Sequence, residues 1–176
     1  MKRSLYQALG NLYGIIPVEK VRELFRTGVD DCPDAMRYRN LVVNPQIPHD
    51  EIAVLEKQQE QHPWYRPGLE RLALYADPLY YDETPESKGF QQYLRGRFSL
   101  TRSRSRYCLG VFSGYIRRAK GVDDLEEIFD SLEFPTISQI EMQTMLSFYI
   151  PFYNHSRMWA NRGFSPKEIR EMRFLP

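Results

Sequence analysis

Length, composition and charge limit what this protein can be. Its 176 residues, 42% hydrophobic and 27% charged, are typical of a globular chain large enough to bury its own core. The 24 basic and 23 acidic residues give a formal net charge of +1, so overall charge neither favours nor excludes a polyanionic partner. Two cysteines exclude a disulfide framework and a four-ligand cysteine zinc site, and we expect both to be reduced thiols.

The N-terminal half is expected to begin with a pair of helices. Leucines recur at helical spacing in 4–13, Gly14 ends that helix, and 15–27 forms a second helix with Pro17 near its first turn. Two helices joined by a tight turn are typical of helix-turn-helix or winged-helix modules. The second helix balances its basic residues with acidic ones, which is unusual for a helix that reads bases.

One small β element and further helices follow. The segment 36–44 weakly alternates and carries β-branched residues, which predicts a short strand. Helices are expected at 48–62 and 69–77. The chain then divides either into an N-terminal helix-turn-helix-like module, 1–50, and a helical domain, 51–176, or into one continuous domain, 1–176.

The C-terminal half is expected to be helical. Apolar periodicity and cap signals predict helices at 86–98, 101–119, 122–132 and 138–154, the last broken before Pro151, and a short helix after Ser165. The N-terminal signals are Thr84-Pro85, a Ser138–Glu141 capping box, and Ser165-Pro166 followed by Glu168. The predicted fold class is mostly α with at most one small β element.

A basic window interrupts the near-neutral charge of the chain. The segment 88–120 contains no Asp or Glu but nine basic residues. On a helix, Arg102, Arg106, Ser113, Arg117 and Lys120 share one side, which predicts a cationic ridge. The phosphate-binding candidates are Arg95, Arg97, Arg102, Arg104, Arg106, Arg117, Arg118 and Lys120. Because arginine forks onto phosphate oxygens and each contact releases counterions, DNA or RNA is one predicted partner.

A structural interpretation of the same ridge stays open. The next predicted helix supplies acidic residues that can neutralise it within the fold, namely Asp123, Asp124, Glu126, Glu127 and Asp130. Alternatively, the arginines face the acidic helices of a protein partner or a second copy, with nearby aromatic residues as anchors. The predicted function is a non-catalytic nucleic-acid-associated or regulatory protein; the alternative is a protein–protein adaptor or homo-oligomer without a nucleic-acid role.

Other residue clusters give weaker signals. His49, His62 and His155 lie in no nucleophile motif, and no glycine-rich phosphate loop is present. Asp123, Glu127 and Asp130 share a helix face that can chelate a hard cation, but a solvated face is favoured. We therefore predict no cofactor and no metal, and the sequence leaves enzymatic activity open.

Three segments spread over most of the chain form a recognisable pattern. They read ALGNLYGIIP at 8–17, HPWYRPGLERLALYADPLYYDETPES at 62–87 and YNHSRMWANRGFSPKEI at 153–169. In this order they resemble a poorly characterised family of bacterial helical proteins that is often associated with a carboxy-terminal SEC-C zinc motif. The matching positions are Tyr75, Ala76, Asp77, Tyr80, Tyr81, Thr84, Pro85, Asn154, Trp159, Asn161, Arg162, Gly163 and Pro166.

The resemblance implies an intracellular helical regulator or adaptor, and the matched residues are typical of packing and turn positions. The cysteine cluster of the SEC-C motif is not present in this chain, so no zinc site is carried over. The three tyrosines of the middle segment can stack on bases, but in a proline-rich loop they are expected to fix the loop to the body of the protein. No stretch reaches the ~18 apolar residues of a membrane span, so we expect a cytoplasmic protein without a membrane contact.

Overall fold

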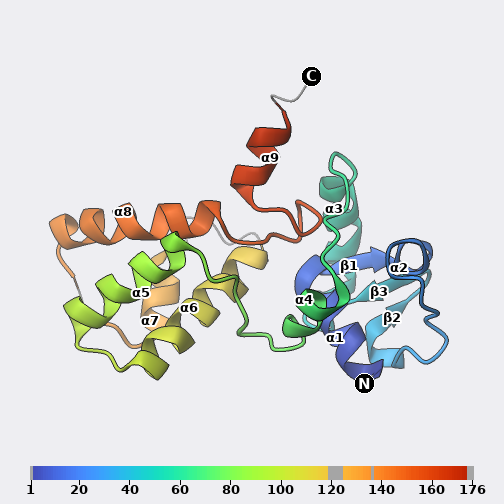
Figure 1. Ribbon diagram of the computed structural model, residues 1–176, viewed down its shortest axis with the longest axis horizontal. Helices are drawn as coiled ribbons and strands as arrows, with labels where there is room; N and C mark the ends of the chain where they lie inside the picture. The colour runs from blue at the N-terminus through green and yellow to red at the C-terminus, as the bar shows by residue number, and fades with distance from the viewer. Residues whose placement is uncertain (1, 119–124, 136, 174–176) are drawn as a thin grey trace.

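The computed structural model describes residues 2–118, 125–135 and 137–173. The described chain is mostly helical with one small antiparallel sheet, which confirms the predicted fold class (Figure 1). In chain order the elements are α1 (Lys2–Tyr13), β1 (Ile15–Pro17), α2 (Val18–Phe25), the 3-10 turn η1 (Asp34–Met36), β2 (Arg37–Tyr38), β3 (Leu41–Val43), α3 (His49–Gln59), α4 (Leu69–Leu74), α5 (Pro85–Phe98), α6 (Arg102–Arg117), α7 (Leu125–Ser131), α8 (Gln139–Asn154) and α9 (Pro166–Met172).

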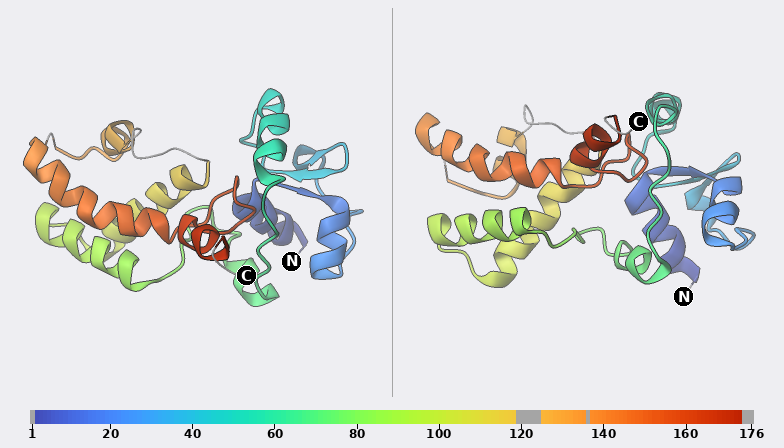
Figure 2. Two further views of the ribbon diagram at one scale, coloured as in Figure 1. Left: turned by 90° about the horizontal axis from the view of Figure 1, so that it is seen from above. Right: turned by 45° about the horizontal axis from the view of Figure 1, so that its top comes forward.

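The elements gather in two groups. Figure 1 shows α1 to α4 with the sheet on one side and α5 to α8 on the other, and Figure 2 shows the same separation from two further directions. Each group has its own buried core. Among the described residues, no helix combines the length and the apolar character that a membrane span requires.

The sheet begins where the second helix was expected to begin. β1 pairs antiparallel with β3, which in turn pairs with β2, so the order is β1-β3-β2. Ile15 and Ile16 are fully buried β-branched residues, and Pro17 has the extended ψ of 140°. Proline suits an edge strand because it has no N–H to donate. A strand therefore replaces the tight turn between α1 and α2.

The expected single strand at 36–44 is a hairpin. β2 and β3 are joined through Arg39, which adopts a positive φ of 53°. A residue in the left-handed region lets the chain reverse within two residues. The sequence signal for this turn was weak because arginine is not the usual occupant of such a position.

The N-terminal core extends beyond residue 50. Tyr6, Leu9 and Tyr13 of α1 pack in one buried cluster with Leu72 and Tyr75 from the end of α4. A boundary at residue 50 would cut this cluster, because α4 supplies part of the surface that buries α1.

The second core is an aromatic cluster between α5, α6, α7 and α8. The Phe90 ring lies 5.4 Å from the Phe112 ring and 5.9 Å from the Tyr149 ring, measured between centroids. Burying aromatic rings in edge-on and tilted pairs is a large part of what holds such helices together. The caps predicted for these helices are present, with capping boxes at Thr84 and Ser138.

Helix α8 does not break before Pro151, as the sequence suggested. It continues to Asn154, and the His155 N–H donates to the Pro151 carbonyl at 3.3 Å. Pro151 lies in the last turn of the helix, and its missing N–H removes one backbone hydrogen bond there.

A buried glutamine and a tryptophan join the C-terminal segment to the N-terminal core. The Gln59 Nε2 amide, almost fully buried, donates to the carbonyls of Tyr13 and Trp159, each at 2.9 Å. The Trp159 indole N–H donates to the Asn11 carbonyl at 2.9 Å. Gly14, with φ of +71°, allows the Trp159 ring to lie directly against the backbone.

Replacing Gly14 with alanine should destabilise the fold. A Cβ at this position would lie 2.6 Å from the Trp159 ring, and its positive φ disfavours any side chain. Overpacking and backbone strain together predict a loss of about 2–5 kcal/mol in the free energy of unfolding. Urea unfolding of Gly14→Ala measures it, with Gly96→Ala as the control, because nothing lies within 4 Å of a Cβ there. The free energy of unfolding of the control should rise by up to about 1 kcal/mol. Equal changes in the two variants would contradict the role given to Gly14.

Candidate phosphate-binding hollow

Helices α5 and α6 form a hairpin whose surface is hollowed. The hollow has a volume of about 240 Å³. It is lined by Tyr81, Glu83, Ser87, Lys88, Gln91, Gln92, Arg95, Arg102 and Arg106. Four of these nine side chains are cationic and one is acidic.

Helical spacing brings these cations together. Lys88, Gln91, Gln92 and Arg95 follow the i, i+3, i+4, i+7 pattern and share one face of α5. Arg102 and Arg106, one turn apart, lie on the facing side of α6. The hollow is therefore built from two helix faces that the 99–101 turn places beside each other.

Gln91, which lines the hollow, makes a polar contact between the two helices. The Gln91 Nε2 amide donates to the Ser105 hydroxyl oxygen at 3.0 Å, and the Ser105 hydroxyl donates to the Arg102 carbonyl at 2.8 Å. Ser105 is fully buried. Because buried polar groups cost free energy unless they are paired, this contact fixes the spacing of α5 and α6.

The charge in the hollow is only slightly compensated. Glu83 lies 3.6 Å from Arg106, and the two side chains are 57% and 50% exposed. An exposed pair at that distance contributes little free energy, so the Arg106 guanidinium stays available. In the part of the chain that the structure describes, Lys88, Arg95 and Arg102 take part in no ion pair, and none links the hollow to Glu127 or Asp130 of α7. Asp123 and Asp124 lie outside the described residues, as does the side chain of Glu126.

Three other predicted phosphate contacts lie elsewhere. Arg97 forms an ion pair with Glu141 of α8. The hydrogen bond from Arg97, aided by the Ser138 N–H, holds the pKa of the Glu141 carboxyl below its usual range. The Arg104 guanidinium donates to the Leu132 carbonyl at 3.1 Å, and Arg118 Nε donates to the Gly114 carbonyl at 3.3 Å. Lys120 lies outside the described residues.

Arg117 differs most from its predicted place on the ridge. Its side chain is inside the protein, at 3% exposure, and its guanidinium donates to the carbonyls of Pro78, at 3.1 Å, and Tyr80. It also lies 5.4 Å from the centre of the Tyr75 ring. Burial lowers the pKa of Arg117, but arginine remains charged at any physiological pH. This residue is a structural cation and offers no contact to a ligand in solvent.

A loop that crosses α6 explains why the ridge stops. A Cβ on Gly110 would lie 2.5 Å from the Leu79 carbonyl oxygen, so the 77–83 segment lies directly on the helix at this glycine. That segment covers the C-terminal half of α6, where Ser113 and Arg117 are buried. Of the ridge residues that the structure describes, Arg102 and Arg106 are exposed and Ser113 and Arg117 are buried.

The residues of the middle family motif hold this loop. Tyr75 is fully buried and its ring lies 4.9 Å from the Tyr80 ring. Asp77 accepts the Leu79 N–H at 2.9 Å, and the Tyr81 ring lies 6.1 Å from Phe152. Tyr81 also reaches the edge of the hollow.

The residues of the last family motif form a tight turn. Arg162 and Gly163 both adopt positive φ, 52° and 87°, and the Gly163 N–H donates to the Met158 carbonyl at 3.0 Å. The Asn161 amide lies 3.7 Å from the Met158 sulfur. Asn154, at the end of α8, accepts a hydrogen bond from Arg170 at 3.3 Å. This turn presents Trp159 to Gly14.

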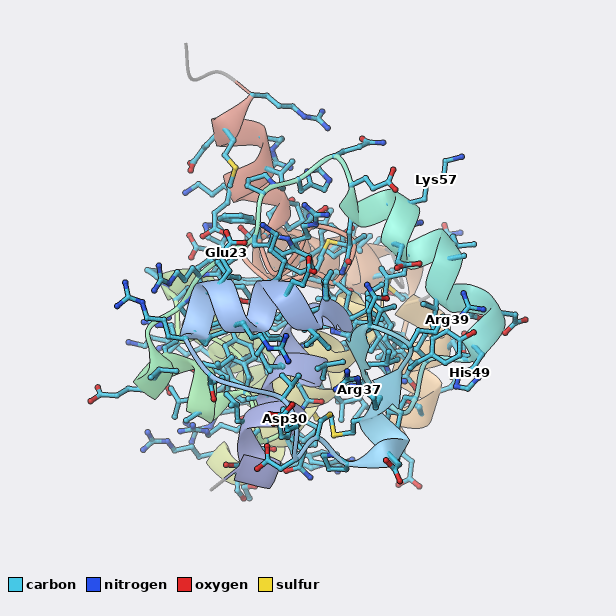
Figure 3. The ribbon with its side chains drawn as sticks, turned by 90° about the vertical axis from the view of Figure 1, so that its right-hand side faces the viewer. Glu23, Asp30, Arg37, Arg39, His49 and Lys57 are labelled. Atoms are coloured by element: carbon cyan, nitrogen blue, oxygen red, sulfur yellow. The ribbon has the colours of Figure 1, made fainter. Side chains whose placement is uncertain are left out.

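The described side chains of helix α2 mix basic and acidic residues on one face. On α2, Lys20 pairs with Glu23 at 2.8 Å and Arg22 lies 3.9 Å from Asp30. Figure 3 shows Glu23 and Asp30 on this face, beside Arg37 and Arg39 of the β2–β3 hairpin. Mixed charge of this kind gives the face no strong potential.

Neither a metal centre nor a catalytic group emerges from the described part of the chain. It holds no cluster of three or more metal-ligating side chains. The His155 Nε2 lies 3.6 Å from Glu86, and its Nδ1 lies 2.8 Å from the Pro151 carbonyl oxygen. Cys108 is buried, which raises the pKa of its thiol and keeps it protonated.

Part of the hollow was missed by sequence reasoning. Lys88 was counted in the basic window but was not placed among the phosphate contacts, and Gln91 and Gln92 were not considered. The signal that finds them is the i, i+3, i+4, i+7 spacing from Lys88 to Arg95. It becomes meaningful only once α6 is known to pack beside that face.

Together these features define a small, mostly helical protein with one cationic surface hollow. Comparisons of the chain with protein-family models, with curated proteins and with solved structures find no match. The resemblance to the SEC-C-associated family therefore stays a prediction, and the candidate site is argued from its own geometry.

The two arginine environments on α6 predict opposite effects of substitution. Arg117→Ala leaves the Pro78 and Tyr80 carbonyls without their donor and should lower the free energy of unfolding by about 2–4 kcal/mol. Arg102→Ala removes an exposed side chain and should change it by less than about 0.5 kcal/mol. Urea unfolding of both variants checks this difference, and equal losses would show that Arg117 is not a structural cation.

His62 predicts a pH dependence of stability. Burial, and then the positive charges of Arg173 and Arg162, lower the pKa of His62 from its ordinary value of about 6.5. The unfolded chain therefore takes up the proton first as pH falls, and the folded state loses stability through that window. Relative to His62→Gln, the natural protein should lose more stability between about pH 8 and pH 5. Thermal unfolding of both proteins across that pH range tests the sign of the difference. Parallel curves of stability against pH would contradict the prediction.

Proposed function

We propose that this is a non-catalytic nucleic-acid-associated protein that contacts phosphates through the α5–α6 hollow. The observation that supports it is the convergence of four cations, Lys88, Arg95, Arg102 and Arg106, around one hollow that contains a single acid. Two helix faces converge there, so the cations are more than the solvated side of one helix.

The chemistry of the lining suits phosphate oxygens. Phosphates accept hydrogen bonds and carry negative charge, and the guanidinium groups of Arg95, Arg102 and Arg106 offer paired donors in one plane. Lys88 adds a point charge. Neutralising phosphates releases condensed counterions, so such binding weakens as salt is raised.

For the cellular role we propose only a broad class, that of a regulatory protein. With no catalytic arrangement in the described residues, a regulatory role fits the hollow, as the family resemblance also implies. We place the protein in the cytoplasm on the basis of its reduced thiols and composition.

A second candidate function is that of a protein–protein adaptor. A groove of about 270 Å³ beside α3 is lined in part by apolar side chains, among them the exposed Val54 and the partly buried Leu55. Val54 is 59% exposed. Such a surface favours a protein partner or self-association.

Charge reversal tests the nucleic-acid proposal. The variant Arg102→Glu, Arg106→Glu should retain the fold, because both side chains are exposed. It should lose at least tenfold in affinity for fluorescently labelled RNA or DNA at about 50 mM salt, measured by fluorescence polarisation, because it replaces two attractive charges with repulsive ones.

The matched control is Arg39→Glu, Lys57→Glu, which changes the net charge equally on the face shown in Figure 3. This control should bind like the natural protein. Loss of binding in the control alone would move the interface to that face. Absence of salt-sensitive binding in the natural protein, together with an oligomeric mass that survives high salt, would favour the adaptor instead.

A further inference from the structure

We infer, on the basis of the proposed function, that the hollow selects single-stranded over duplex nucleic acid and holds two successive phosphates of one strand. The inference rests on the arrangement of the four cations, the size of the hollow and the aromatic ring at its edge.

The four cations form two pairs. Arg95 and Arg102 flank the 99–101 turn, whereas Lys88 and Arg106 lie farther along the hairpin. At about 1.5 Å per residue, the two positions are separated by about 6 Å along α6 and about 10 Å along α5. A chain of phosphates running along the hollow meets the first pair and then the second.

The contact between Gln91 and Ser105 separates the two pairs. Because the Gln91 amide donates to the Ser105 hydroxyl oxygen, it is already engaged in the contact between α5 and α6. The cations on either side are therefore two separate anion positions, not one cluster around a single ion. A ligand with one phosphate can satisfy only one of them.

The size of the hollow favours a single strand over a duplex. Its volume of about 240 Å³ is below the roughly 300–1,000 Å³ typical of pockets for drug-sized ligands. A duplex presents its phosphates on the outside of a wide, stiff cylinder and cannot bend one strand into so small a space. A single strand is flexible enough to enter it.

Tyr81 supplies the remaining feature. Its ring is half-buried against Phe152, which fixes its position, and part of it borders the hollow next to Arg106. Sites for single strands combine a cationic groove with such aromatic surfaces, on which unpaired bases stack. A base paired within a duplex is not available for this contact.

The experiment compares a labelled single-stranded octamer, as RNA and as DNA, with the duplex of the same sequence. Polarisation titrations between about 50 and 200 mM salt should give a slope of log affinity against log salt near −1.4 for two phosphates, and about a sevenfold loss of affinity. The duplex should bind at least tenfold more weakly. Lys88→Gln, Arg106→Gln removes one pair and should reduce the slope to about −0.7.

Two further variants complete the design. Tyr81→Leu keeps an apolar contact to Phe152 and should weaken the octamer without changing the salt slope, because stacking releases no counterions. Lys57→Gln, on helix α3 in Figure 3, should leave both the affinity and the salt slope unchanged. Circular dichroism and thermal unfolding confirm that each variant is folded.

The outcomes separate this inference from the proposed function. Equal or tighter binding of the duplex, still lost in the Arg102→Glu, Arg106→Glu variant, would overturn the strand preference and leave the function in place. If inorganic phosphate competed as well as the octamer at the same concentration of phosphate groups, the two-phosphate arrangement would be overturned. If neither strand form bound in a salt-dependent manner, the function itself would fail.

Discussion

The buried guanidinium of Arg117 is the interaction on which this architecture depends. The guanidinium donates to the carbonyls of Pro78 and Tyr80, which holds the 77–83 loop against α6. The backbone carbonyl of Arg117 accepts the backbone N–H of Trp159 at 3.0 Å. One residue thus connects the loop, the second core and the C-terminal segment that reaches into the first core. Arg117 forms no ion pair with the described residues, and such a charge is costly to bury; the two carbonyls and the Tyr75 ring offset that cost.

This constraint divides the basic window into two kinds of arginine. Where the loop lies on α6, Arg117 is buried and bound to loop carbonyls. Beyond the loop, Arg102 and Arg106 remain exposed beside α5. Glycine at position 110 makes the division possible, because only a residue without a side chain lets the Leu79 carbonyl approach so closely. The proposed site lies within the part of the window that the loop leaves uncovered.

Local signals in the sequence predicted much of the fold. The capping boxes at Thr84, Ser138 and Ser165 act within four residues, so they were readable and are present. The predictions that were wrong depend on distant partners. Ile15 is a strand residue because Val43 pairs with it, and nothing within the segment 15–27 indicates that pairing.

The same distinction applies to the candidate site. Helical periodicity correctly grouped Arg102 with Arg106, but it also grouped Arg117 with them, because a helical wheel cannot show which part of a helix another segment covers. Lys88 and Gln91 became part of the site only through the packing of α5 against α6. Sequence alone therefore located the region of charge, whereas the hollow is a tertiary feature.

The contact between Trp159 and Gly14 has a consequence for how the protein is made. During synthesis the N-terminal residues leave the ribosome first, yet the ring that covers Gly14 arrives on the order of ten seconds later. Until then Tyr13 and Gln59, both buried in the finished protein, lack part of their covering. The first core to emerge is thus completed last, and the nascent chain carries an open apolar surface through most of its translation.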